Sequence, residues 1–191
     1  MLKKDEAMKG IIEKEGEIEL SKSTDYFVSL GEAMIYQQIS WKAAKTIYEK
    51  YKKLFPNERI SPEEHIKLNE NDLQTAGISR QKRTYLDSLA EKFIDKTIKP
   101  EKFDQMTDEE IIRELVQIKG IGRWTAQMFL IFSLAREDVF APDDLGLRRA
   151  IMQIYGFNEL PSPKELEQFS TRWQPYRSYA SLYLWRFARK Q

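Results

Sequence analysis

The sequence contains no cysteine and only one histidine, His65, among its 191 residues. Without cysteine the chain can form no disulfide, no thiolate nucleophile and no iron–sulfur cluster held by cysteines. A single histidine also argues against a multi-histidine metal site. Any chemistry must therefore rest on carboxylates, hydroxyls, lysines or the backbone.

An excess of charge of one sign and a long hydrophobic run are also missing. The 31 basic and 30 acidic residues leave a net charge of +1, which argues against a polybasic nucleic-acid binder but leaves a local basic face open. The longest apolar runs, such as 128–134, are far shorter than a membrane span, and the N-terminus turns polar too early for a signal peptide. We expect no membrane partner and a cytoplasmic location.

Helix signals recur along the chain, and no segment alternates at period two for long enough to predict a strand. A chain with 41% hydrophobic residues can bury the core of one domain or of two closely joined lobes. We predict an all-α protein of eight to ten short helices. Its clearest signals are N-terminal caps at Ser61, Thr107 with Glu110, and Ser162 with Glu165, and C-terminal glycines at Gly77 and Gly156.

Two of only eight glycines flank a single isoleucine in the stretch "KGIGRWTAQMFLI", residues 119–131. One apolar helical face ends before Gly120 and another begins after Gly122, which predicts a helix, a hairpin and a second helix. Glycines there would leave amide N–H groups exposed at the start of the second helix, where the helix dipole favours a phosphate without net protein charge. A plain turn is the alternative.

Four segments together carry a resemblance that spans roughly residues 25–188. "LVQIKGIGRWTAQMFLIF" followed by "DVFAPDDLGLRRAI" resembles the helix-hairpin-helix (HhH-GPD) DNA glycosylase superfamily, and "EAMIYQQISWKAA" and "RWQPYRSYASLYLW" resemble its 3-methyladenine DNA glycosylase II (AlkA-like) branch. The resemblance implies a single domain, residues 1–191, in the two-lobed, all-α form of the fold. The hairpin lobe would be about 30–130 and the other lobe about 1–29 plus 131–191, without the N-terminal β subdomain of larger members.

The resemblance also implies an activity, which is hydrolysis of the N-glycosidic bond of alkylated purines, of the 3-methyladenine and 7-methylguanine type. The substrate would be double-stranded DNA containing a damaged base, which is flipped out of the stack. The protein would need no cofactor, act as a monomer and associate with a nucleoid in a prokaryote or enter a nucleus in a eukaryote. Bifunctional members carry a nucleophilic lysine where Trp124 stands, so the chain is expected to be monofunctional and to leave an abasic site.

The catalytic carboxylate of the family matches Asp144, the second acid of "APDDLG". An ionised carboxylate there would stabilise the oxocarbenium-like transition state and orient water. Alternatively, Asp143 or Asp144 caps the following helix, and for Asp144 both roles can hold at once. Asp143 is assigned to structure or capping.

By position in their motifs, Trp124, Trp185 and Tyr36 match walls of a pocket for the flipped base. Aromatic rings would attract a positively charged alkylated purine, although helical spacing fits core aromatics equally well. Gln38 matches the residue that wedges into the duplex, where larger relatives have leucine. Gln37 and Gln38 could otherwise simply end a helix.

The family hairpin binds DNA phosphate through backbone N–H groups, here those of Gly120, Gly122 and Thr125. It also uses main-chain carbonyls to hold a monovalent cation, Na⁺ or K⁺, against the phosphate. Arg148 and Arg149 would add phosphate contacts or form a solvated face. The carbonyls that match the cation site belong to Val116, Ile118 and Ile121.

Three other functions remain open. A non-catalytic helix-hairpin-helix DNA-binding module would have lost the carboxylate, which this chain keeps. A glycosylase for neutral lesions such as ethenoadenine or hypoxanthine would need help for the leaving group, because only charged bases leave readily without an acid. A glycosylase with lyase activity on oxidised bases is opposed by Trp124.

Overall fold

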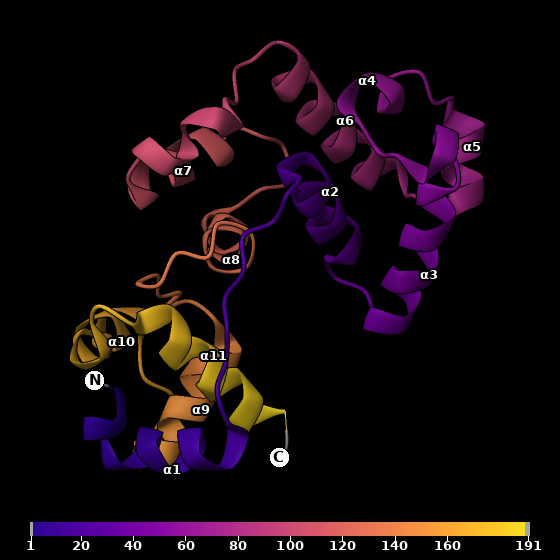
Figure 1. The fold of residues 1–191 in the computed structure, drawn as a ribbon. Helices are drawn as coiled ribbons and strands as arrows, with labels where there is room; N and C mark the ends of the chain where they lie inside the picture. Colours follow the sequence, from indigo (N-terminus) through magenta and orange to yellow (C-terminus); the bar gives the residue numbers. More distant parts are fainter. Residues whose placement is uncertain (1, 190–191) are drawn as a thin grey trace. The chain divides into compact units, whose positions relative to one another are not determined.

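The computed structural model describes residues 2–189, and every regular element in that range is a helix (Figure 1). The all-α prediction is therefore confirmed for the described part of the chain. This part contains eleven α-helices and four 3₁₀ helices, more than the eight to ten expected.

The chain divides into two compact units. We call Ser23–Phe129 the hairpin unit, and Met1–Lys22 with Leu130–Gln191 the terminal unit. The second boundary falls inside α8, Arg123–Phe132. Besides the start of α8, the hairpin unit contains α2 (Tyr26–Tyr36), α3 (Trp41–Lys52), η2 (Pro56–Glu58), α4 (Pro62–His65), α5 (Glu70–Ala76), α6 (Arg80–Ile94), η3 (Pro100–Gln105) and α7 (Asp108–Leu115).

In the hairpin unit α6 is the central helix, because both α2 and α4 pack against it while α3 packs against α2 and α5 (Figure 1). The buried face of α6 carries Leu86, Leu89 and Ala90. This packing fixes the end of α2 and the beginning of α6 beside each other. Residues near both helix ends line the hollow of the candidate site.

The terminal unit is built around α11, which packs against both α9 and α1. The first twenty residues, whose order the sequence left open, thus supply a packed helix. Asp5 caps α1 and also accepts a hydrogen bond from the Tyr155 hydroxyl, 2.8 Å away on α9. The elements of this unit are η1 (Leu2–Lys4), α1 (Glu6–Glu15), the end of α8, α9 (Leu145–Tyr155), α10 (Pro163–Ser170), η4 (Thr171–Trp173) and α11 (Arg177–Ala188).

The predicted helix ends are present. Thr107 and Ser162 each form a reciprocal capping box with the glutamate three residues later, and Gly77 and Gly156 end their helices in the left-handed conformation. At Ser61 the hydroxyl accepts the Glu64 N–H at 3.2 Å, while the Glu64 carboxylate pairs with Lys67. These caps are local, so sequence alone predicts them.

Candidate active site and nucleic-acid interface

Asp144 lies at the N-terminus of α9 and is its capping residue. Its Oδ1 accepts the backbone N–H of Leu147 at 2.8 Å, so the carboxylate sits where the helix dipole favours a negative charge. The side chain is half-buried, whereas Asp143 is exposed. Asp144 is therefore the helix cap that the sequence offered as an alternative, and the cap geometry also fixes the carboxylate in one orientation.

Trp185, on α11, donates its indole N–H to the same Oδ1 of Asp144 at 3.0 Å. The sequence allowed a core stripe for this residue, but Trp185 is not among the buried residues of α11. Its ring stacks on Phe132 with 5.8 Å between centroids and an interplanar angle of 26°. Phe132 is 52% exposed, so an aromatic pair with an accessible edge lies beside the carboxylate.

Gly146 makes room for this arrangement. A Cβ atom at Gly146 would lie 3.0 Å from Asp144 Oδ1, which is closer than comfortable packing allows, and 3.4 Å from Trp185 Cδ1, in ordinary van der Waals contact. Neither Gly146 nor Phe132 was singled out from the sequence. For Gly146 the signal was its place two residues after the aspartate, whereas Phe132 carried no signal beyond an apolar helix.

In the hairpin unit five of the predicted residues, Tyr36, Gln38, Gly120, Trp124 and Thr125, line one hollow of about 590 Å³. Trp124 is 45% exposed there, so it is not the core aromatic that the sequence left open. The half-buried Tyr36 contributes a second aromatic wall, and Gln38 is exposed at the rim. The hollow is lined by Ala33, Tyr36, Gln37, Gln38, Tyr85, Gly120, Trp124, Thr125 and Met128.

The two hairpin glycines have different roles. Gly120 has φ +89°, and a Cβ atom there would lie 2.3 Å from the Tyr85 ring, so both the backbone and the packing require glycine. Gly122 does not have a positive φ, and a Cβ atom on it would meet nothing within 4 Å. The chain's own packing thus leaves the surface at Gly122 open, immediately before the N-terminus of α8.

The first helical hydrogen bond of α8 runs from Ala126 N–H to the Gly122 carbonyl at 3.0 Å. The amides of the preceding turn therefore point out of the end of the helix, past Gly122. Thr125 belongs to this turn, but its side chain is only 8% exposed. Its backbone rather than its hydroxyl is the part that suits a phosphate contact.

Three long-range hydrogen bonds hold the end of α2 and the loop after it. Gln37 Nε2 donates to the Gly120 carbonyl at 3.0 Å, which ties the loop to the hairpin. Lys82 Nζ donates to the carbonyls of Ile35 and Gln37 at the end of α2, and burial lowers the pKa of this lysine. Gln38 follows with φ +58°, a backbone conformation that residues other than glycine rarely adopt.

Gln37 and Gln38 therefore end a helix, as the sequence allowed, and also form a fixed loop. We call residues 37–40 the wedge loop. Its last residue, Ser40, caps α3 by accepting the Ala43 N–H at 3.3 Å.

The three residues predicted to hold a cation all lie in the hairpin. Val116 ends α7, and the Ile118 carbonyl accepts the Ile121 N–H at 3.1 Å. The side chains of Ile118 and Ile121 are buried, so they join the hairpin to the core. Neutral carbonyl oxygens are suitable ligands for Na⁺ or K⁺, and the ion remains a prediction.

The predicted arginines are engaged differently. Arg148 donates from Nε to the Pro161 carbonyl at 2.9 Å, which is a structural role, while Arg149 is exposed. Arg123, at the start of α8, forms an ion pair with Glu109 of α7, and this hydrogen bond lowers the pKa of the Glu109 carboxyl.

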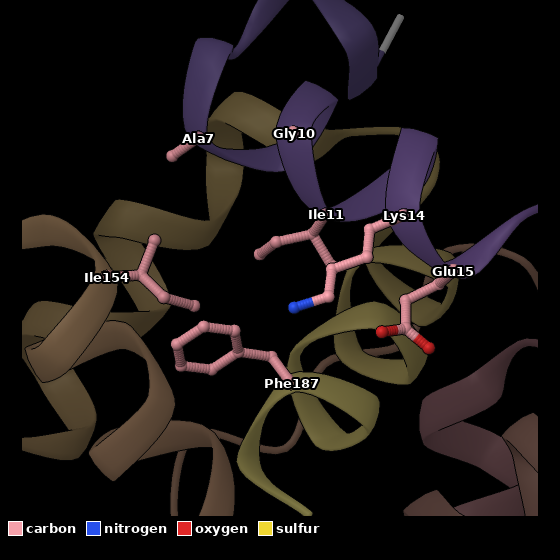
Figure 2. A pocket seen from close by; sticks show the side chains of 7 residues that line it. All are labelled: Ala7, Gly10, Ile11, Lys14, Glu15, Ile154 and Phe187. Atoms are coloured by element: carbon pink, nitrogen blue, oxygen red, sulfur yellow. The ribbon is translucent and has the colours of Figure 1, made fainter. Parts of the chain in front are cut away.

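A separate hollow of about 340 Å³ lies in the terminal unit and contains none of the predicted residues. Figure 2 shows Lys14 of α1 reaching into it toward Phe187 of α11. Its walls are otherwise mostly apolar, and it is excluded from the candidate site. The lining residues are Ala7, Gly10, Ile11, Lys14, Glu15, Ile154 and Phe187.

Seven of the predicted residues thus fall into two groups. Asp144 and Trp185 are joined by a hydrogen bond in the terminal unit, and Tyr36, Gln38, Gly120, Trp124 and Thr125 share a hollow in the hairpin unit. Within residues 2–189 there is no cluster of three metal-ligating side chains. In the same range no helix is long and apolar enough to cross a membrane.

Comparison with known proteins identifies the family to which the chain belongs. The family model described as "HhH-GPD superfamily base excision DNA repair protein" matches residues 32–175. DNA-3-methyladenine glycosylase 1 of Schizosaccharomyces pombe is 36% identical over 156 residues, which cover 81% of this chain and 68% of that protein. A Bacillus subtilis relative is 33% identical over 159 residues, and the chain spans 55% of its length.

Solved structures of related glycosylases support the same family. A DNA-3-methyladenine glycosidase from Bacillus halodurans superimposes with a TM-score of 0.87 at 34% identity, over 98% of this chain and 86% of that one. The S. pombe 3-methyladenine DNA glycosylase in complex with abasic DNA gives 0.86 at 33% identity, over 97% and 92%. The resemblance read from the four sequence segments is confirmed. The chain belongs to the HhH-GPD superfamily of base-excision DNA repair proteins, in the branch that includes the 3-methyladenine DNA glycosylases.

Proposed function

We propose that this chain is a monofunctional DNA glycosylase that hydrolyses the N-glycosidic bond of alkylated purines. The observation that carries the proposal is the carboxylate of Asp144, held by the Leu147 N–H and the Trp185 indole beside an exposed aromatic pair. The relatives named above are called 3-methyladenine glycosylases, which supports the same substrate class.

Cleavage of this bond develops positive charge on the deoxyribose as the base departs. A carboxylate whose position is fixed beforehand stabilises that charge without having to reorganise, and it can orient the attacking water. Oδ1 of Asp144 accepts hydrogen bonds from the Leu147 N–H and from the Trp185 indole, so this oxygen anchors the carboxylate. Asp144 therefore acts as an electrostatic stabiliser and a water-orienting group.

A substrate that already carries positive charge needs no general acid. N-alkylated purines such as 3-methyladenine or 7-methylguanine leave as neutral bases once the bond breaks. Their positive charge also favours stacking on electron-rich rings, which Trp124, Trp185 and Tyr36 offer. We propose these three residues as the walls of the base pocket.

DNA is the partner, as in the S. pombe structure with abasic DNA. We propose double-stranded DNA with a damaged base as the form recognised by a monomeric protein. Gly120, Gly122 and Thr125 would contact phosphate through backbone N–H groups, aided by the predicted cation at the hairpin. Gln38, held at the exposed rim of the hollow, would fill the gap that the flipped nucleotide leaves.

Base release from methylated duplex DNA tests the proposal, with Asp144→Asn compared against Asp143→Asn. Asparagine is as good a helix cap as aspartate, so the first variant keeps the fold and can keep both hydrogen bonds while losing the negative charge. Asp143 is the exposed acid next to it and provides the matched control. We expect the native chain and Asp143→Asn to release methylated purines and Asp144→Asn to bind abasic-site DNA without releasing base.

Three other outcomes would change the proposal. DNA binding without base release by the native chain would favour a non-catalytic module. Release of hypoxanthine or ethenoadenine in preference to methylated purines would move the substrate class to neutral lesions. A protein–DNA adduct trapped by borohydride would show a lysine nucleophile and would contradict the proposal that the glycosylase is monofunctional.

A further inference from the structure

Trp41 is the most exposed large hydrophobic side chain in residues 2–189, at 67% of its surface. An indole has a large apolar face, and tryptophans left in water on a stable protein are enriched at contact sites. Ile39, two residues earlier, is also exposed, at 38%. Neither residue was assigned a role by the sequence or by the candidate site.

The position of Trp41 is fixed relative to the wedge loop. Ser40 caps α3, so Trp41 is the first residue of that helix and follows Gln38 by three peptide units. Three units span at most about 11 Å between Cα atoms. The Cα atom of Trp41 therefore lies within about 11 Å of the Cα atom of the residue proposed to enter the duplex.

The charge around Trp41 suits a nucleic acid. Lys45, one helical turn further along α3, places its Nζ 5.2 Å from the centre of the Trp41 ring. The first turn of α3 contains no acidic residue, and Glu49 further along is paired with Lys52 at 3.0 Å. An aromatic face with an ammonium group beside it combines the two contacts that single-stranded nucleic acid offers, base stacking and phosphate charge.

Extrusion of a nucleotide creates a place where such a face is needed. The base on the opposite strand loses its pairing partner, and the stack beside it is interrupted. Gln38 is polar and flexible, so it covers the exposed face of a base less well than an aromatic ring would. Trp41 lies close enough to supply the missing apolar surface.

We propose that Trp41 stacks on the unpaired base opposite the extruded nucleotide, with Lys45 contacting a neighbouring phosphate. The two side chains would stabilise the opened duplex, a function that Gln38 fulfils only in part. This inference rests on the proposed function for its geometry, because it requires a duplex with one nucleotide removed from the stack. It does not require that the chain be catalytic.

The experiment measures binding to two duplexes that differ only at one position. One duplex contains a tetrahydrofuran abasic analogue with 2-aminopurine opposite, and the other is intact with 2-aminopurine at the same place. The proteins compared are the native chain, Trp41→Ala, Trp41→Phe, Lys45→Gln and Ile94→Ala. Ile94 is 43% exposed on α6 and lies about 18 Å along that helix from Lys82, so it is a matched control in the same unit.

We expect Trp41→Ala to bind the abasic duplex about tenfold more weakly, the effect of losing one base–aromatic stack, with little change on the intact duplex. The 2-aminopurine signal in the complex should differ from that of the native protein, because the base no longer stacks on an indole. Trp41→Phe should restore most of the affinity. Lys45→Gln should weaken binding and reduce its salt dependence, and Ile94→Ala should bind as the native chain does.

Equal affinity of Trp41→Ala and the native chain for the abasic duplex would overturn the inference. An equal loss on both duplexes would also overturn it, because it would show a general surface contact. A change in sedimentation of the free protein with unchanged DNA binding would assign Trp41 to self-association instead. If the native chain released no alkylated base, the proposed function would fail, yet these affinities would still decide the role of Trp41.

Discussion

Trp185 donates its indole N–H to Asp144 Oδ1 at 3.0 Å, so a residue that is proposed to wall the base pocket also orients the carboxylate. The same oxygen accepts the Leu147 N–H at 2.8 Å. Two donors on one oxygen fix the plane of the carboxylate. The proposed stacking of the base and the proposed stabilisation of the transition state thus both depend on the Trp185 side chain.

Replacing Trp185 by phenylalanine separates the two roles, since the ring is kept and the donor is lost. A hydrogen bond to a charged group contributes about 1.5–3 kcal/mol, so we expect base release to slow by roughly tenfold or more. Single-turnover release and binding to abasic-site DNA measure the effect on chemistry and on binding. Equal losses in both, or no loss in chemistry, would contradict an orienting role for the indole.

Alanine at each hairpin glycine gives a second prediction. Gly120→Ala forces a Cβ atom 2.3 Å from Tyr85 at φ +89°, and we expect it to lower the free energy of unfolding by about 2–4 kcal/mol. Gly122→Ala meets no neighbour, so stability should change by no more than about 0.5 kcal/mol.

Gly122→Ala should weaken DNA binding even though it leaves the stability of the fold almost unchanged. Its Cβ atom would occupy the surface before α8 that a phosphate is proposed to reach, so affinity for duplex DNA should fall although the fold is intact. Urea unfolding and DNA binding of the two variants provide the check. Native affinity of Gly122→Ala would mean that phosphate does not approach this amide.

The sequence predicted the parts of this molecule that depend on near neighbours. The capping residues Thr107 and Ser162 act within three residues, so their patterns are visible in a short window. The pair Gly120 and Gly122 marked the hairpin, although only the first has a positive φ. The branch of the superfamily followed from motifs that are each local as well.

Long-range contacts could not be predicted from the sequence. Gln37 and Gly120 are 83 residues apart and Lys82 and Ile35 are 47 apart, so no local pattern joins them. On α11 only Tyr183 is buried among Tyr179, Leu182, Tyr183 and Phe187, although the helical spacing of these four residues is typical of a single apolar face. Close packing of α11 against α9 and α1 instead buries small residues, which hydrophobicity does not reveal. The buried residues are Ser178, Ala180, Ser181, Tyr183 and Leu184.

The wedge loop supports a third prediction, based on its two glutamines. Gln37→Ala removes the 3.0 Å hydrogen bond to the Gly120 carbonyl and should lower the free energy of unfolding by about 0.5–1.5 kcal/mol. Gln38→Ala removes an exposed side chain that has no such anchor, so stability should barely change.

We expect the order of the two glutamine variants in activity to differ from their order in stability. Gln38→Ala should slow release of a methylated base from duplex DNA more than from single-stranded DNA, because only the duplex has a stack to open. Comparing both substrates for both variants is the measurement. If Gln38→Ala released base from the two substrates at the same relative rates as the native chain, Gln38 would not be the wedge.

The single histidine gives a pH-dependent prediction. His65 of α4 is 1% exposed, and its Nδ1 lies 2.8 Å from the Tyr51 hydroxyl of α3 while its Nε2 lies 3.0 Å from Asp87 of α6. Burial lowers the pKa of His65, an effect opposed by Asp87 and reinforced by Arg83. The ring therefore stays neutral in the folded protein at a pH where it is protonated in the unfolded chain.

Because the unfolded chain then binds one proton more than the folded chain, the free energy of unfolding should fall as the pH drops below about 6.5. The contribution of His65 is fully present above that pH and decreases, by at most about 1.4 kcal/mol per pH unit, until the folded pKa is reached. Urea unfolding of the native chain and of His65→Gln at pH 7.5, 6.5 and 5.5 measures the effect. The variant should be about 1–3 kcal/mol less stable at pH 7.5, where two buried hydrogen bonds are lost, and should show a shallower slope. Parallel slopes for the two proteins would mean that His65 does not cause the acid sensitivity.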